Sequence, residues 1–470
     1  MKTKRYQLWV EDEATEGTLE APVVADALYA IDVKAEPNYD EIDLSRVANS
    51  LDREATLIGQ KRWKVDFGLD FKGGGNSGGV PNLPECDRLL RMGGMKVVQC
   101  YYLTGTAITG TIAHGETFTQ AVSGAAGVVI GSYTGTPTRF HYLITNGIQV
   151  VVSQVITCSG GATFDPGGTP GITAHGYRYR PVSDQWSVAT RGAWTGTAVA
   201  GEIVIGATSG AVGLLLDPMP PQGSGGQVAI DVLLGTFTTE TITGQTSTAT
   251  CSLTGALLGT HNCSGSIAWL LDGQAVYIQG ARCDWKIPME TGKPLRIDFS
   301  AQGFQSTVVT QQLGNATYVT TPPPRFVSAN WSLDGRGFYI GKCELAGGNS
   351  LGLRPDANSA EGAISYRISD RDLTITIDPE NVVPAGYDFL AKAAASTLVS
   401  AKMRFNATEA QLHNMVLATY AGSVIWIDIP AIQYAPPKYG DREGTVTAEI
   451  TGRIRRGSSA GDDALSIYFL

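Results

Sequence analysis

The most constraining feature of this 470-residue sequence is a set of segments in which every second residue is apolar. A period of two residues is typical of a β-strand with one buried and one exposed face. The pattern predicts strands at 63–71, 295–301, 373–378 and 446–450. In the first, Trp63, Val65 and Phe67 would face a core, while Lys64 and Asp66 would face water. The expected fold class is therefore mainly β.

Helical patterns are sparse. One short helix is predicted at 84–92, where Pro and Glu precede the apolar positions and Gly93 follows them. A second is predicted at 386–396, and a third candidate covers 408–416. The sequence therefore indicates antiparallel sheets with one or two helices per unit.

A crude duplication organises the chain. An alternating strand, a short helix, further strands and a final alternating strand occur once before residue 320 and again after it. The interval from Ala281 to Gly303 nearly equals the interval from Ala431 to Gly452. We therefore expect two tandem β-sandwich or barrel units, each with a flanking helix. The first would comprise residues 1–102 and 266–320, and the second residues 321–470.

A sharper repeat interrupts the first unit. Residues 115–127 resemble residues 201–213 at a constant offset, and both copies lie in a region rich in Gly and Thr. Glycine at strand ends and threonine within strands suit tight hairpins. Residues 103–265 are therefore predicted to be an insertion of small β modules on the outer surface, where added chain leaves a core undisturbed.

No motif for catalysis or metal binding stands out. The seven cysteines include no CxxC pair and the five histidines have no HxH or HExxH spacing, so we expect free thiols in a reducing cytosol and no metal site. A GxGxxG match at 73–78 and GxSxG matches around Ser77 and Ser459 lack the strand and helix context that their chemistry needs. No catalytic, cofactor-binding or metal residue is predicted, and the chain is not expected to be an enzyme.

The charge and hydropathy patterns exclude further classes. The sequence has 35 basic and 44 acidic residues, so tight binding to a phosphate backbone is not expected. Its first residues carry charges with no apolar segment behind them, and no run of 18 apolar residues occurs. We therefore expect neither a secretory signal nor a membrane span.

Several segments resemble the tail tube proteins of long, non-contractile-tailed bacteriophages. In the first unit these are 10–18, 25–32, 53–59, 63–74 and the helix at 87–94 with the preceding Pro81. In the second unit they are 343–349 and 369–378. The resemblance covers roughly 1–102 and 266–470 and leaves the insertion outside.

The resemblance implies a structural virion protein that acts as a conduit for genome ejection. Units of this family form six-fold rings that stack into a tube, so a duplicated chain implies a homotrimer with pseudo-six-fold symmetry. It further implies partners among other tail proteins (tape measure, terminator and distal tail proteins), passage of DNA without binding, and no cofactor. The implied location is the virion tail, assembled in the cytoplasm of the bacterial host.

Two groups of residues would serve this role. An excess of carboxylates on the channel wall would repel DNA, and the lumen candidates are Asp66, Asp70, Asp298, Asp372, Asp378 and Glu449. The alternative is that these acids face the outer solvent. Segments 39–59 and 347–368 would contact the neighbouring ring, through Tyr39, Asp40, Glu41, Arg46, Arg53, Asn349, Arg354, Asp356 and Glu361. The alternative is a pair of surface loops on a monomer.

A rival interpretation is a glycan-binding or adhesive module of a phage or bacterial surface. Its basis is the Gly/Thr-rich repeats together with Trp186, Trp194 and Trp269. A tail-associated glycan hydrolase is a third, less favoured interpretation.

Overall fold

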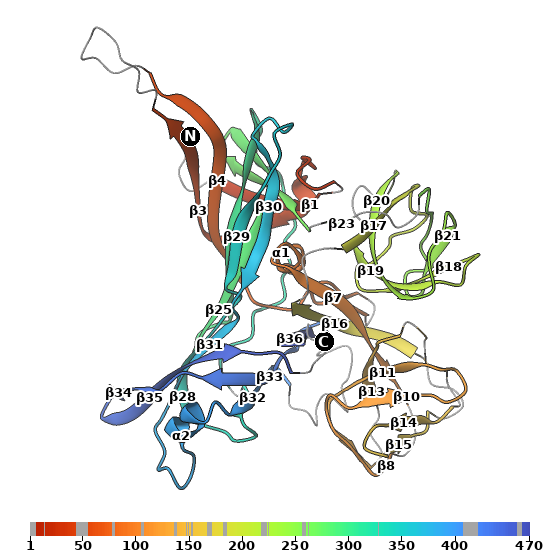
Figure 1. Ribbon diagram of the computed structural model, residues 1–470, viewed down its shortest axis with the longest axis vertical. Coiled ribbons are helices and arrows are strands. Elements are labelled where there is room, and N and C mark those ends of the chain that lie inside the picture. The colour runs from red at the N-terminus through yellow and green to blue at the C-terminus, as the bar shows by residue number, and fades with distance from the viewer. Residues whose placement is uncertain are drawn as a thin grey trace.

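The protein is mainly β, as the alternating patterns predict, in a computed structural model of the chain (Figure 1). The structure describes residues 6–13, 15–43, 55–77, 80–104, 108–135, 139–146, 148, 150–151, 154–166, 172–181, 186–217, 223, 225–255, 260–261, 263–327, 329–407, 422–457 and 463–470. The four strands expected from alternation are all present, in longer or slightly shifted form: β4 (Leu57–Asp70), β26 (Arg296–Val309), β31 (Thr374–Pro379) and β35 (Thr445–Ile454).

Six antiparallel strands form a first set. They lie side by side in the order β1 (Tyr6–Asp12), β24 (Gly265–Leu271), β25 (Gln274–Glu290), β26, β4 and β3 (Ile31–Ile42). Numbered along the chain, these are the first, fourth, fifth, sixth, third and second strands of the set. The order is therefore not the order of the sequence, because β1 and β4 pair with strands that follow more than 200 residues later, β24 and β26 respectively.

Six further strands form a second set with the same order. They are β27 (Ser332–Leu333), β32 (Leu398–Phe405), β33 (Ile425–Tyr434), β35, β31 and β28 (Ile340–Ala346). These again are the first, fourth, fifth, sixth, third and second strands of their set along the chain. In both sets a short helix follows the third strand.

The two sets join directly. Residues Lys286–Glu290 at the end of β25 pair with Lys342–Ala346 of β28, so a single sheet runs from one set into the other. The apolar faces of both sets share one core, which contains Val65, Phe67 and Ile297 from the first and Ile375 and Ile450 from the second. The alternation predicted from the sequence therefore corresponds to burial on one side of one continuous sheet.

The two predicted helices are confirmed, with shorter bounds. α1 (Asp87–Met92) ends at Gly93, and the Arg91 guanidinium bonds Asp87 one turn away and Asp12 of β1. α2 (Phe389–Ala394) begins after Asp388, whose side chain accepts the backbone N–H of Ala391 at 2.8 Å. A 3-10 turn, η1 (Val24–Asp26), lies near β1. The third helix candidate, 408–416, lies outside the described residues.

Residues 104–166 form a small β module with its own core, here called module A. Its strands are β8 (Ile108–Thr109), β9 (Thr111–Ile112), β10 (Thr117–Thr119), β11 (Ala126–Ile130), β12 (Tyr133–Thr134), β13 (Phe140–Ile144), β14 (Ile156–Cys158) and β15 (Thr163–Phe164). The core is aromatic, with the rings of Phe140 and Phe164 stacked 4.6 Å apart.

Residues 186–261 form a second small β module, here called module B, which packs against β7 (Met95–Leu103) through Val98. Its strands are β17 (Trp186–Arg191), β18 (Ile203–Gly206), β19 (Val212–Asp217), β20 (Gly226–Leu234), β21 (Thr241–Gly244), β22 (Thr250–Ser252) and β23 (Thr260–His261). Both modules lie on the right of Figure 1, away from the arm formed by β3 and β4.

Each copy of the sequence repeat at 115–127 and 201–213 contains a glutamate, the half-buried Glu116 or the buried Glu202, whose carboxylate accepts backbone N–H groups of nearby loops. In module B, Glu202 accepts the backbone N–H groups of Val199, Thr246 and Ser247, and Glu240 accepts those of Thr208, Ser209 and Thr238. Glu202 is therefore hydrogen-bonded to the loop after β21, and Glu240 to the loop after β18. In module A, Glu116 accepts the N–H groups of Ala113 and Gly160 in the same manner.

The range assigned to the insertion also holds a strand of the main core. β7 (Met95–Leu103) pairs with β16 (Ile172–Pro181), which pairs in turn with β36 (Ser466–Phe469), and β36 pairs with β33. Tyr179 of β16 is fully buried in the main core, and its hydroxyl donates to Asp87 at 2.6 Å. Residues 103–265 therefore contain two surface modules and one strand that helps to hold the whole chain together.

The remaining strands are short or lie at edges. They are β2 (Ala27–Leu28), β5 (Asn76–Ser77), β6 (Val80–Pro81), the hairpin of β29 (Asn349–Pro355) with β30 (Ala363–Arg371), and β34 (Lys438–Arg442), which pairs with β35. The β29–β30 hairpin packs over β25 and β26, where the Tyr366 ring lies 5.4 Å from that of Phe304.

Candidate functional site: one polar face shared by six strands

A single polar face extends across the junction of the two strand sets. The strands β4, β26, β25, β28, β31 and β35 pair in succession, so residues opposite one another in register point to the same side. Asp66 lies opposite Ser300, and Ser300 lies opposite Asp284. Glu344 of β28 lies opposite Pro288 on one side and Thr376 on the other. The other side of these strands forms the main core.

All six acids selected from the sequence lie on this face. Asp66 and Asp70 alternate along β4, and Asp298 is opposite Gly68 between them. Asp378 lies in β31. Asp372, two residues before β31, has the same alternation phase and pairs with Arg453, the partner of Thr374. Glu449 lies two residues from Thr451, the partner of Thr376. Their side chains are half-buried or exposed. The structure thus brings together residues that are up to 383 positions apart in the sequence.

The face also carries basic residues that the sequence-based selection did not include. Lys64 Nζ lies 2.8 Å from Asp66, and Arg296 pairs with both Asp298 and Asp32. Further along the sheet, Arg442 lies 3.1 Å from Asp378. The alternation that places Asp66 on the polar face also places Lys64 there, so the sequence pattern already indicated basic residues on this face. The face is of mixed sign rather than uniformly acidic.

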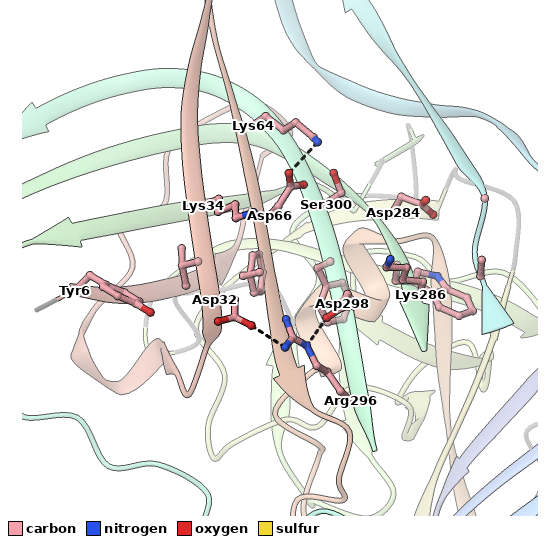
Figure 2. Close-up of a pocket in the computed structure, with 16 residues that line it drawn as sticks. Tyr6, Asp32, Lys34, Lys64, Asp66, Asp284, Lys286, Arg296, Asp298 and Ser300 are labelled. Carbon is pink, nitrogen blue, oxygen red and sulfur yellow. Dashed lines mark hydrogen bonds and ion pairs between the residues drawn. The ribbon is translucent and has the colours of Figure 1, made fainter. Parts of the chain in front are cut away.

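Two adjoining hollows open along this face. The first has a volume of about 850 Å³ and is lined by charged residues that include Lys34, Asp66, Lys286 and Arg296 (Figure 2). The second, of about 880 Å³, is lined by residues of β25, β28, β31, β34 and β35. Arg296 lines both, so the hollows meet near its side chain. The β29–β30 hairpin covers the far end of the face, where Phe304 lies opposite Arg62.

Burial and hydrogen bonds shift the pKa values of two carboxyl groups at the rim of the hollows. Burial raises the pKa of Asp284, whose Oδ1 accepts the backbone N–H of Asn349. The hydrogen bond from Lys293 lowers the pKa of Glu290, which is exposed. In this wall Asp284 is held by a backbone hydrogen bond and Glu290 by an ion pair. Among the described residues of this wall, no group combines a perturbed pKa with a nucleophile and a matching base.

The segments proposed to contact a neighbouring ring differ from one another. Tyr39, Asp40 and Glu41 belong to β3, where they form part of the projecting arm, whereas Arg46 and Arg53 lie outside the described residues. The second segment is the β29–β30 hairpin, which packs on the same chain rather than projecting freely.

Contacts of this hairpin show why it is held. Asn349 is buried, and its side-chain amide donates to the carbonyl oxygens of Gly93 and Cys283. Arg354 pairs with Glu16, and Glu361 accepts the backbone N–H of Lys61. Asp356 caps its own turn through the N–H of Asn358. Asn349 therefore does not lie in an exposed loop, because its amide fills a buried hydrogen-bonding position.

Comparison with known proteins adds no relative. No protein-family model matches the chain, and no curated protein matches it. Function must therefore be argued from the geometry. Among the described residues, neither α-helix is long and apolar enough to span a membrane, and no group of three His, Cys, Asp or Glu residues could hold a metal ion.

The other motifs of the sequence have structural explanations where the structure describes them. Gly73 and Gly75 of the glycine-rich loop pack against Gly422, and a Cβ at Gly73 would lie 2.1 Å from the Gly422 oxygen. All seven cysteines are buried and none forms a disulfide in the described residues, and burial raises the pKa of Cys100 to about 12. The side chain of Ser77 and the whole of Ser459 lie outside the described residues.

Trp194 and Trp269, two of the three tryptophans behind the glycan-binding interpretation, do not form an aromatic platform. Trp194 is 5% exposed in the core of module B, and Trp269 is half-buried against Trp63, at a ring distance of 5.7 Å. The side chain of Trp186 lies outside the described residues. Stacking on a sugar needs an accessible ring face, so these two described tryptophans do not favour that interpretation.

Proposed function

We propose that this chain is a structural subunit of a bacteriophage tail tube, in which two tandem sheet units per chain form part of a closed ring. The observation that carries the proposal is the repeated strand order, first, fourth, fifth, sixth, third and second, together with a short helix after the third strand of each set. A tandem duplication accounts for two independent sets with one order.

The junction between the units supports a ring. β25 and β28 extend one sheet into the next, and all six candidate acids lie on the same side of it. A sheet that continues from unit to unit removes exposed edges when it closes on itself. Three copies of a two-unit chain would place six similar units around one axis, with the polar face toward the channel.

The mixed charge of that face agrees with a conduit. DNA that must slide needs a wetted wall with no dense basic patch, because phosphate binding grows with each uncompensated Lys or Arg. Here Lys64, Arg296 and Arg442 are each paired with carboxylates. Passage of DNA, contact with tape measure, terminator and distal tail proteins, and a place in the virion tail assembled in the host cytoplasm are parts of this proposal.

Electron microscopy of the purified full-length chain tests it. We expect rings or stacked tubes with three chains per ring, and mass photometry of the dissociated assembly should give a trimer. A protein that stays monomeric at all concentrations and ionic strengths, while it binds cell-wall glycans, would contradict the proposal.

A further inference from the structure

Two strands of the described chain each leave one edge without a strand partner. β3 pairs only with β4, and β34 pairs only with β35, among the described residues. An open edge presents a row of unpaired N–H and C=O groups and is a template for another strand. The two edges lie at opposite ends of the long sheet, since β3 borders the first strand set and β34 the second.

The chain already contains one junction between units, and its residues can be aligned with these edges. β28 of the second set corresponds to β3 of the first, as the second strand of each set. Lys34 lies opposite Asp66, and Lys342 is the neighbour of Cys343, which lies opposite Ile377 next to Asp378. Glutamate follows two residues after each lysine, at Glu36 and Glu344. β3 and β28 therefore share a register as well as a position in their sets.

β34 corresponds in the same way to the last part of β25. Asp284 pairs with Ser300, which pairs with Asp66. Ile450 lies opposite Ile377, so the next residues along the two strands, Glu449 and Asp378, also lie opposite each other. Lys438 in turn lies opposite Glu449. Lys438 thus occupies the place of Asp284, and Arg442, four residues on, occupies the place of Pro288.

We propose that β34 of one copy pairs antiparallel with β3 of a second copy and so repeats the β25–β28 junction between chains. This inference rests on the proposed ring and names the edges that close it. Because Glu344 lies opposite Pro288 within the chain, Glu36 lies opposite Arg442 of the second copy. The same register places Asn38 opposite Gly440, and Asp40 opposite Lys438.

The side chains brought together by this register are complementary. The polar face receives two opposite-charge pairs, Glu36 with Arg442 and Asp40 with Lys438. On the other face, Tyr39 meets Tyr439, and these rings are 38% and 58% exposed in the single chain. Pro37 lies within the pairing, and Pro288 shows that the corresponding junction accepts a proline.

The arm formed by the outer parts of β3 and β4 gives independent support. In the second set, the corresponding β29–β30 hairpin packs on the neighbouring unit through Tyr366. In the first set, Ile42, Leu57 and Ile58 on the arm are each half exposed or more. A neighbouring unit supplied by a second copy would cover them as the first set covers β29–β30.

A disulfide trap tests the register in the full-length protein. Asp40→Cys combined with Lys438→Cys places two thiols directly opposite each other, where Cβ atoms of paired strands approach to about 5 Å. Oxidation of assembled rings should convert most of the protein into a ladder of covalent bands that ends at the ring number, three. The seven native cysteines are buried and should contribute no background.

Matched controls separate pairing from proximity. Each single variant should give no ladder. Asp40→Cys combined with Tyr439→Cys shifts the second thiol to the opposite face and should cross-link at least tenfold less. Rings that form normally but give no ladder with the first pair, or an equal ladder with the shifted pair, would overturn the inference and leave the tube proposal intact.

A second measurement needs no variant. Rings assembled from equal amounts of ¹⁴N- and ¹⁵N-labelled chains can be treated with a carbodiimide, which joins a lysine to a carboxylate in contact. Mixed-isotope peptides that join Lys438 to Asp40 or Glu36 are the expected result. Their absence from intact rings would overturn this interface, whereas a protein that forms no rings at all would contradict the proposed function itself.

Discussion

His114 of module A donates a hydrogen bond from Nε2 to Oδ2 of Asp428 on β33, at 3.0 Å. The backbone N–H of Gly131 donates to His114 Nδ1, so the proton of the neutral ring is held at Nε2. The imidazole also stacks on Trp426, with ring centres 4.5 Å apart. One side chain therefore attaches module A to β33, a strand of the second strand set.

We expect His114→Ala to loosen this attachment. The loss combines a hydrogen bond to a carboxylate, about 1.5–3 kcal/mol, with an aromatic contact of about 1 kcal/mol. Denaturant unfolding followed by tryptophan fluorescence should show a destabilisation of about 2–4 kcal/mol. Val122→Ala, at a position 83% exposed in the same module, should change stability by less than about 0.5 kcal/mol. Equal effects of the two substitutions would contradict the assigned role.

The glutamates of the modules should differ in importance according to their hydrogen bonds. Glu240 accepts three backbone N–H groups and the Ser209 hydroxyl, whereas Glu116 accepts two backbone N–H groups. We expect Glu240→Gln to destabilise module B by about 3 kcal/mol, because the amide nitrogen would face donors. The destabilisation caused by Glu116→Gln should be about half that caused by Glu240→Gln, because Glu116 accepts fewer hydrogen bonds. Thermal unfolding of the two variants in parallel measures the difference, and a larger effect at Glu116 would be inconsistent with this account.

Two carboxyl groups, those of Glu13 and Glu240, should make the free energy of unfolding depend on pH in opposite directions. Burial raises the pKa of Glu13 to about 7, although Ser264, Ser266 and two backbone N–H groups bond to it. The folded state therefore holds its proton more tightly than the unfolded state does. This contribution to stability is complete below about pH 4.5 and is lost as the pH rises toward 7.

Glu240 behaves in the reverse way. Burial acts to raise its pKa, but hydrogen bonds from Ser209, Thr238 and Thr208 lower it to about 2. Its contribution is complete above about pH 4.5 and is lost as the pH falls toward 2. Unfolding measured from pH 3 to 8 should show that Glu13→Gln flattens the upper range and Glu240→Gln the lower range. Unchanged slopes in both variants would refute the assignment.

Charge reversal on the polar face should make the assembled wall retain DNA. Glu344 and Glu449 have exposed side chains on β28 and β35, so Glu344→Lys with Glu449→Lys should change stability by less than about 1 kcal/mol. Repeated around a ring, the new lysines should bind double-stranded DNA at low salt and release it steeply as salt rises. Filter retention by assembled rings measures this. Asp165→Lys, an exposed site on module A, is the control, and equal retention by both would argue against a lumen position.

The strands of the long sheet could be predicted because each records one-sided burial in its own sequence. Val65, Phe67 and Leu69 are buried, and Lys64, which precedes them, is exposed, as the alternation requires. Lys72 departs from the pattern. β4 ends at Asp70, and beyond it the buried Lys72 ammonium donates to the carbonyl oxygen of Val319.

The shared polar face could be predicted only in part. The pattern identifies the polar side of each strand, but the order of strands depends on pairings between segments far apart, such as β25 with β28. β16 was predictable in principle, since Tyr177 and Tyr179 alternate with arginines. Its place inside a Gly-rich region hid that signal. The hydrogen bonds of Glu202 and Glu240 also join each glutamate to a loop 31 to 45 residues away, which no local period encodes.

Gly422, just before β33, should be among the positions least tolerant of substitution, because it contacts Gly75 in the loop after β4. Gly422 has a φ of +73°, and a Cβ there would lie 1.9 Å from the carbonyl oxygen of Gly75, whose N–H donates to the Gly422 oxygen at 3.1 Å. Gly422→Ala should therefore cost about 3 kcal/mol or more, from the left-handed backbone and the steric overlap together. Gly444 has a φ of +86°, and a methyl group added there would meet no described atom within 4 Å, so Gly444→Ala should cost only about 1 kcal/mol. Chemical denaturation of the two variants distinguishes overlap from backbone strain, and similar losses at both positions would show that the contact with Gly75 is not what requires glycine at 422.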